Sequence, residues 1–224
     1  MPDYSLPPCV TLIFGRSGTG KTTFAFRYLV NALTQQPLND NPAACVFIFD
    51  WKLEAANRLG VRPASTFADC ENALAGRIVC FNPHILFRAE EGMAPAEDRA
   101  LRWFAMWAFE VSRRGPGRKI FYVDELRQFV KSHSAQLPPE IERVTRQGRS
   151  ENLELLSSTQ YPKDYARTIR ESVTEWVCFN IADPDELDSV RPYFPGVDAV
   201  AGLPRGEFIS CNRETGAELR GKLF

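Results

Sequence analysis

The chain has 224 residues, of which 44% are hydrophobic and 25% are charged, and this composition is ordinary for a globular protein with a full core. Its formal net charge of -1 argues against a simple nucleic-acid-binding module, so any DNA contact must come from a local patch or a ring of subunits. No apolar run approaches the roughly 18 residues that a membrane-spanning helix needs, and the N-terminus lacks the pattern of a signal peptide.

Short apolar runs alternate with segments of helical apolar spacing along the chain. In chain order, strands are predicted at 9–14, 44–50, 77–81, 119–123, 153–159 and 176–181. Helices are predicted between them at 22–33, 98–112, 139–148 and 165–172. The tail from 206 to 224 carries Glu-Thr-Gly between two short runs, which favours a β-hairpin at the edge of the sheet. These elements predict an α/β fold in one domain, 1–224, with a mostly parallel sheet flanked by helices and a C-terminal β-hairpin.

The segment GRSGTGKT at 15–22 matches the phosphate-loop pattern G-x-x-x-x-G-K-S/T without a mismatch, between a predicted strand and a predicted helix. Its glycines let the backbone wrap closely around phosphate, so that successive N–H groups point inward at the positive end of the helix. Lys21 supplies a charge to the β- and γ-phosphates, and the Thr22 hydroxyl holds Mg²⁺. The sequence therefore predicts an ATP and Mg²⁺ site. The predicted nucleotide-binding residues are Gly15, Arg16, Ser17, Gly18, Thr19, Gly20, Lys21, Thr22 and Thr23.

Two acids follow the apolar strand at 119–123. Ligands of open α/β sheets bind at the carboxyl ends of the strands, so Asp124 is predicted beside the phosphate loop, where it would hold Mg²⁺ through water. Glu125 is a candidate general base for the attacking water. The alternative is that Glu125 caps the next helix or pairs with Arg127. A second acid favours ATP hydrolysis over phosphate transfer to a small molecule, which does not need it.

Two further groups are candidates for catalysis. Gln160 follows the strand at 153–159 and could contact the γ-phosphate or the attacking water; the alternative is a satisfied polar strand end. Arg143, Arg146 and Arg149 lie three apart along a predicted helix and its exit. One of them could act as an arginine finger on the γ-phosphate of a neighbouring subunit, which requires a ring or a dimer. Arg146 and Arg149 are favoured because they are nearest to the strand that leads to Gln160, and the alternative is a solvated basic face.

Taken together, these segments resemble the FtsK–HerA branch of P-loop ATPases. The resemblance is carried by the phosphate loop, the strand ends FDWK at 49–52 and VDE at 123–125, and RQGRSENLELLSSTQYP at 146–162, with a looser match at LPRGEF, 203–208. The short chain is most similar to the genome-packaging ATPases of tailless, membrane-containing double-jelly-roll viruses. The resemblance implies a RecA-like core, a hexameric ring and translocation of double-stranded DNA. It also implies that Asp124 and Glu125 form the Walker B pair, that Gln160 senses phosphate, and that Arg146 or Arg149 is the finger.

Two loops are expected to face the DNA channel. One holds Arg127, Lys131, Ser132 and His133, and the other holds Tyr161, Lys163 and Arg167. Repeated around a ring, either would form a basic collar that follows phosphates without reading sequence, although each could equally be an ordinary solvent-facing loop. The resemblance places the protein in the host cytoplasm or at the portal vertex of a virion, with viral membrane or vertex proteins as further partners.

Two other functions remain open from the sequence. One is a filamentous-phage assembly or secretion-type ATPase, in which nucleotide controls an interaction. The other is a small-molecule nucleotide kinase, against which the acid pair at 124–125 argues.

Overall fold

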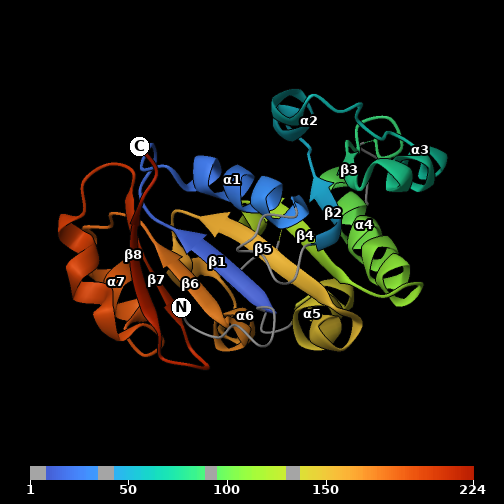
Figure 1. Cartoon of the computed structure of the whole chain (residues 1–224). Helices are drawn as coiled ribbons and strands as arrows, with labels where there is room; N and C mark the ends of the chain where they lie inside the picture. Colours follow the sequence, from blue (N-terminus) through green and yellow to red (C-terminus); the bar gives the residue numbers. More distant parts are fainter. Residues whose placement is uncertain (1–8, 35–42, 89–94, 130–136) are drawn as a thin grey trace.

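The computed structural model describes residues 9–34, 43–88, 95–129 and 137–224 (Figure 1). Its centre is an eight-stranded sheet in the order β3-β2-β4-β5-β1-β6-β7-β8. The strands are β1 (Val10–Phe14), β2 (Ala43–Phe49), β3 (Ile78–Phe81), β4 (Arg118–Asp124), β5 (Leu153–Thr159), β6 (Glu175–Cys178), β7 (Glu207–Asn212) and β8 (Glu218–Lys222). The strands β1 to β6 run parallel, whereas β7 and β8 pair antiparallel and form the C-terminal hairpin. The predicted α/β fold and its hairpin are therefore confirmed.

The described helices fill the connections between the strands. They are α1 (Lys21–Leu33), α2 (Glu54–Leu59), α3 (Phe67–Ala73), α4 (Ala96–Arg113), α5 (Pro139–Gln147), α6 (Arg167–Ser172) and α7 (Pro184–Val190). Short 3₁₀ turns add η1 (Leu74–Gly76), η2 (Leu126–Gln128), η3 (Gly148–Glu151), η4 (Pro162–Asp164) and η5 (Pro195–Gly202). None of the helices in the described residues combines the length and apolar character that crossing a membrane requires.

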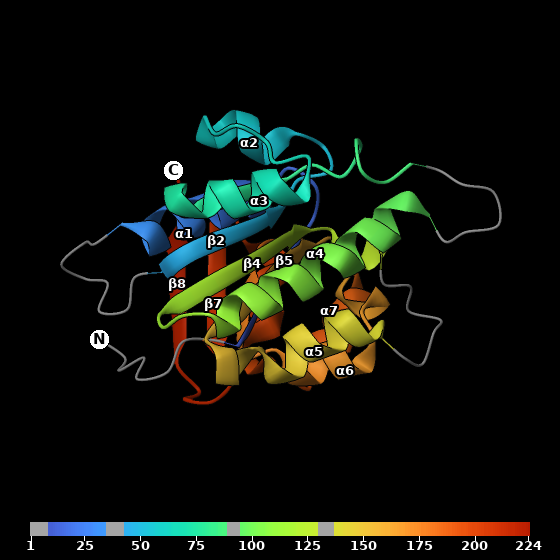
Figure 2. The same cartoon turned by 90° about the vertical axis from the view of Figure 1, so that its right-hand side faces the viewer.

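The parallel strands of the sheet are buried on both faces, as their continuous apolar runs require, whereas the edge strand β8 is exposed. On one face, Ile120 of β4 packs with Leu29 of α1 in one hydrophobic cluster. On the other face, Phe121 packs with Phe104 of α4 and with residues of α5 and α6. Figure 2 shows the sheet between α1 on one side and α4, α5 and α6 on the other. The aromatic residues of α4 pack in or against this core, where Phe104 stacks on Phe81 of β3 with ring centroids 4.8 Å apart.

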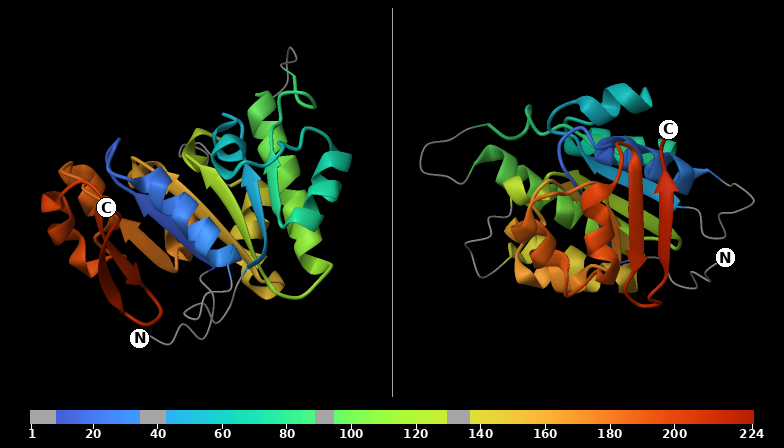
Figure 3. Two further views of the ribbon diagram at one scale, coloured as in Figure 1. Left: turned by 45° about the horizontal axis from the view of Figure 1, so that its top comes forward. Right: turned by 90° about the vertical axis from the view of Figure 1, so that its left-hand side faces the viewer.

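The C-terminal hairpin closes the sheet beside β6, with α7 lying next to it (Figure 3). Its last residues return to the amino end of α1, where the N–H of Leu223 donates to the carbonyl of Gly206 over 2.9 Å. The predicted strand at 176–181 ends earlier, at Cys178, because the next residues leave the ladder to contact the phosphate loop. The hairpin thereby supports the segment that carries the nucleotide motif.

A buried polar cluster ties β1, α1, β4 and β5 together beneath α1. Glu154 accepts hydrogen bonds from the Thr11 hydroxyl at 2.8 Å, the Tyr28 hydroxyl at 2.7 Å and the Arg118 guanidinium at 2.6 Å. The Glu154 side chain is 1% exposed and that of Arg118 is 11% exposed, so each charge depends on the other for compensation.

Replacement of Arg118 by alanine is expected to lower the free energy of unfolding by about 3–5 kcal/mol, because it leaves the Glu154 carboxylate buried without its cation. Urea denaturation measures this loss. The matched control is Arg220→Ala, which removes an arginine that is 63% exposed and paired with Glu207; it should cost about 1 kcal/mol or less. Equal losses in the two variants would contradict the importance of the buried pair.

Candidate active site

The phosphate loop at 15–22 lies at the carboxyl edge of the sheet, between the ends of β1 and α1. Three neighbouring segments hold its backbone. The N–H of Gly15 donates to the carbonyl of Thr159 at the end of β5, and that of Arg16 donates to the carbonyl of Asn180 after β6. The carbonyl of Thr19 accepts from the N–H of Gly206 over 3.0 Å. The loop is therefore held in place by contacts from distant parts of the chain.

Glycine is required in the loop for conformational and spatial reasons. Gly15 and Gly20 have φ angles of 150° and 120°, which L side chains rarely adopt. A Cβ at Gly15 would lie 2.6 Å from the Cβ of Phe179, and one at Gly20 would lie 2.8 Å from a methyl group of Leu223. These close approaches let the loop pack directly against Phe179, which follows β6, and against the C-terminal segment.

Lys21 begins α1 and is 7% exposed. Its ammonium group donates to the carbonyl of Gly15 at 2.8 Å and to that of Arg16 at 3.1 Å. Desolvation lowers the pKa of Lys21, while Glu125 and Asp124 oppose that shift. A buried ammonium group at the amino end of a 13-residue helix is suited to binding an anion such as a phosphate chain.

A cavity of about 410 Å³ opens in front of the loop. Its walls come from the phosphate loop, the ends of β2, β4 and β5, and the C-terminal hairpin. The lining residues are Ser17, Gly18, Gly20, Lys21, Thr22, Thr23, Lys52, Glu54, Asp124, Glu125, Arg127, Gln128, Gln160, Arg205 and Phe224. The space and the mixed polar lining fit a nucleoside triphosphate. The structure thus brings most of the sequence-predicted loop residues together with Asp124, Glu125 and Gln160; Gly15, Arg16 and Thr19 are outside this lining.

Asp124 and Thr22 both line this cavity and also a smaller neighbouring one. Asp124 accepts a hydrogen bond from the hydroxyl of Ser158, which is its register partner on β5, and it lies 4.0 Å from the ammonium group of Lys52. A carboxylate and a hydroxyl beside a phosphate site form the donor set that Mg²⁺ uses with phosphate oxygens and water. Among the described residues, no group of three or more His, Cys, Asp or Glu forms a separate metal cluster.

Glu125 is 9% exposed and leaves the strand direction with a φ of 50°. Burial and the neighbouring Asp124 raise the pKa of Glu125, and Lys21, Arg127 and a hydrogen bond from Gln160 lower it. Arg127 lies 3.9 Å from Glu125, so the alternative pairing considered from the sequence is present as a loose ion pair. That pair coexists with the position of Glu125 in the cavity wall, where its carboxylate can accept a proton from water.

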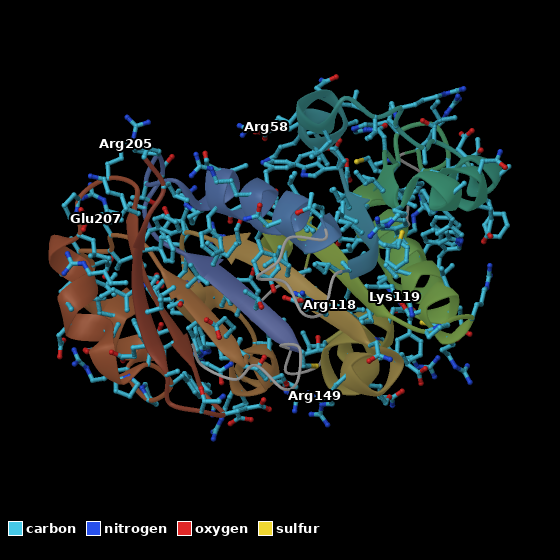
Figure 4. All side chains as sticks on the ribbon, in the orientation of Figure 1. Arg58, Arg118, Lys119, Arg149, Arg205 and Glu207 are labelled. Atoms are coloured by element: carbon cyan, nitrogen blue, oxygen red, sulfur yellow. The ribbon has the colours of Figure 1, made fainter. Side chains whose placement is uncertain are left out.

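Arg146 and Arg149 lie away from this cavity. Arg149 precedes the amino end of β5, whose seven residues span about 20 Å. The phosphate loop follows the carboxyl end of β1, which pairs with β5 in parallel, so the loop lies at the other end of these strands. Figure 4 labels Arg149 at the opposite end of the molecule from Arg205, which lines the cavity. Arg146 pairs with Glu142 and Arg149 pairs with Glu214. Neither arginine can reach the γ-phosphate position of its own chain.

The expected DNA-facing loops are described in part. Lys131, Ser132 and His133 lie outside the described residues. In the second loop, Lys163 lies 3.4 Å from Glu186, and Arg167 pairs with Glu171 at 2.6 Å. These cations already face carboxylates within the chain, so a nucleic acid would have to compete for them.

Several residues of the cavity were not predicted from the sequence as site residues. Lys52 belongs to the FDWK segment, but only the fold brings its ammonium group to Asp124. Arg205 and Phe224 reach the site from the hairpin, far along the chain from the phosphate loop. The LPRGEF segment was a signal for Arg205, whereas no local pattern marks Ser158 or Phe224.

No protein-family model and no curated protein sequence matches the chain. Several solved structures do match its fold. The genome packaging NTPase B204 from Sulfolobus turreted icosahedral virus 2, in complex with AMPPCP, superposes with a TM-score of 0.75 at 18% identity, covering 96% of this chain and 97% of that one. VirB4 of Thermoanaerobacter pseudethanolicus matches with a TM-score of 0.67 at 13% identity, over 96% of this chain and 88% of that one.

A third match is the pCW3 conjugation coupling protein TcpA with ATPγS, with a TM-score of 0.63 at 14% identity, over 99% of this chain and 61% of that one. These neighbours are a genome packaging NTPase, VirB4 and a conjugation coupling protein. At such identities the likeness establishes the fold, which is that of a RecA-like P-loop NTPase. The resemblance found in the sequence motifs is confirmed at this level.

Proposed function

We propose that the chain is an ATPase domain that hydrolyses ATP to translocate double-stranded DNA, as the packaging motor of a viral genome. The observation that carries the proposal is the single cavity that joins the phosphate loop to Asp124, Glu125 and Gln160. The B204 protein, whose structure matches this fold, is a genome packaging NTPase, and the match covers nearly the whole of both chains. The corresponding location is the host cytoplasm or the portal vertex of a virion, where viral membrane or vertex proteins would be further partners.

The chemistry follows from the positions of the side chains. The N–H groups of the loop and the Lys21 ammonium group bind the phosphates, and Gln160 orients the attacking water. Glu125 accepts a proton from the water as the water oxygen attacks the γ-phosphorus. The bond between the γ-phosphorus and the bridging β-phosphate oxygen then breaks, which releases ADP and inorganic phosphate. Thr22 and Asp124 would hold Mg²⁺, which supplies charge neutralisation at the β- and γ-phosphate oxygens.

The finger residues require a second copy of the chain. Arg146 and Arg149 are too far from the cavity of their own chain, but a neighbour in a ring could present them to it. Such a ring, with six subunits as the resemblance implies, would also place several cavities around one channel. Charge stabilisation by a finger in trans accelerates hydrolysis by on the order of 10³–10⁵.

Mixing two inactive variants tests the finger in trans. Arg149→Ala subunits lack the finger but keep the catalytic acid, and Glu125→Gln subunits have the opposite defect. Mixed assemblies are expected to recover part of the turnover, because some interfaces then combine an intact acid with an intact arginine. Arg146→Ala is tested in the same way, and Arg113→Ala, at the exposed end of α4, is the control. No recovery at any mixing ratio with either variant would contradict a finger at these positions.

Stimulation by nucleic acid tests the proposed function. Phosphate release should rise when random-sequence double-stranded DNA is added, and the mass of the assembly measured with ATP and DNA should be a multiple of the chain mass. The stimulation should fall as salt rises, because contacts to phosphates release counterions. Turnover without any response to DNA would favour an assembly or secretion ATPase, and phosphate transfer to a nucleotide acceptor would favour a kinase.

A further inference from the structure

Arg127 contacts three groups that belong to different parts of the site. It lies in η2, directly after the acid pair at the end of β4. Its Nη1 donates to the carboxylate of Asp164, and its guanidinium lies 4.3 Å from the centroid of the Tyr161 ring. Its Nε lies 3.9 Å from the carboxylate of Glu125. A planar guanidinium can make such contacts on its edges and its face at the same time.

Tyr161 and Asp164 belong to one short segment, 161–164, which is itself well anchored. The N–H of Tyr161 donates to the Thr159 hydroxyl at the end of β5. The N–H of Lys163 donates to the buried carboxylate of Glu186 on α7 over 3.1 Å. The 161–164 segment therefore fixes one side of Arg127 to β5 and α7, and any displacement of the segment would move the guanidinium.

The same segment begins one residue after Gln160, which lines the cavity together with Glu125 and lowers the pKa of Glu125. Glu125 is linked to the segment through Arg127, which contacts Tyr161 and Asp164. The contact of Arg127 with Asp164 is a direct hydrogen bond, whereas its contact with Glu125 is longer. Asp164 and Tyr161 consequently decide how close the guanidinium lies to Glu125.

We propose that Arg127 is a positioning residue that couples the 161–164 segment to Glu125, so that the state of the segment sets the reactivity of the catalytic acid. The proposal rests on the role of Glu125 as the general base in the proposed function. It does not depend on which partner binds the segment.

A double-mutant cycle on ATP turnover, measured without DNA, tests this coupling. Asp164→Asn is expected to change kcat by about threefold or more in the otherwise unchanged chain, an effect typical of coupled neighbours. In an Arg127→Ala background the same change should have no effect, because the connection is already broken. Multiplicative effects of the two substitutions would overturn the proposal. The matched control is the exposed pair Arg191 and Asp198, whose substitution should leave kcat unchanged.

The split between kcat and KM separates this role from general damage to the fold. Arg127→Ala should change kcat and leave the KM for ATP unchanged, because Arg127 contacts Glu125 and the 161–164 segment. Arg127→Lys, which keeps the cation but not the planar guanidinium, should restore only part of kcat. A change confined to KM in Arg127→Ala would also overturn the proposal.

The result is distinguishable from failure of the proposed function. Coupling between Arg127 and Asp164 without stimulation of turnover by DNA would support the inference and contradict the translocase function. Stimulation by DNA with multiplicative effects of the two substitutions would support the translocase function and contradict the inference. Absence of all ATP turnover would remove both, because the coupling acts through Glu125.

Discussion

Replacement of Lys21 by alanine is expected to lower ATP turnover by a factor on the order of 10²–10³ or more, as removal of one preorganised charge from a transition state does. The ammonium group is buried and donates to the carbonyls of Gly15 and Arg16, so its position beside the loop is fixed. ATP affinity should fall as well, because the group faces the phosphates in the ground state. Phosphate release and titration with a fluorescent ATP analogue measure the two effects.

The controls for Lys21→Ala address charge and folding. Arg113→Ala removes an exposed cation at the end of α4 and should leave turnover unchanged. Thermal unfolding of Lys21→Ala should remain cooperative, since the alanine removes two hydrogen bonds but opens no cavity in the hydrophobic clusters. Turnover of Lys21→Ala close to that of the unchanged chain would place the chemistry at another site.

Replacement of Glu125 by glutamine is expected to slow hydrolysis by a factor on the order of 10²–10⁴ while ATP binding is retained. The amide keeps the size of the side chain and its place beside Gln160 but cannot accept the proton of the attacking water. Because burial and Asp124 raise the pKa of Glu125, the acid limb of turnover in the unchanged chain should lie above the ordinary range of a glutamate. Turnover should fall as the pH drops through this limb, because Glu125 becomes protonated and can no longer act as a base.

Single-turnover phosphate release and ATP binding separate the two steps for Glu125→Gln. Glu110→Gln is the matched control, because Glu110 is a half-exposed acid on α4 that pairs only with surface arginines in the described structure. Hydrolysis at an unchanged rate in Glu125→Gln would remove this residue as the base. Loss of ATP binding would instead assign it a role in holding the nucleotide.

The parts of the site that the sequence predicts are those encoded by local patterns. The phosphate loop is one continuous segment whose glycines and lysine have fixed spacing, and the acids at 124 and 125 follow directly on an apolar strand. The strand order was not predictable in this way, because β1 pairs with β5 and β6 across more than a hundred residues of chain. The contacts Ser158 to Asp124 and Lys52 to Asp124 depend on that order.

The short helices α2, α3 and α7 were missed for a similar physical reason. Each has six or seven residues, too few to show an apolar period. The carboxylate of Asp50 at the end of β2 accepts the N–H groups of Ala55 and Ala56 at the start of α2. Asp183 similarly accepts the N–H of Asp185 at the start of α7.

The most direct test of the proposed chemistry is a structure of Glu125→Gln assembled with ATP, Mg²⁺ and double-stranded DNA. The proposal predicts a triphosphate between the loop at 15–22 and Gln160, Mg²⁺ beside Thr22 and Asp124, and an arginine from the partner subunit at the γ-phosphate. A nucleotide bound elsewhere, or a triphosphate whose γ-phosphate is remote from residue 125, would contradict it.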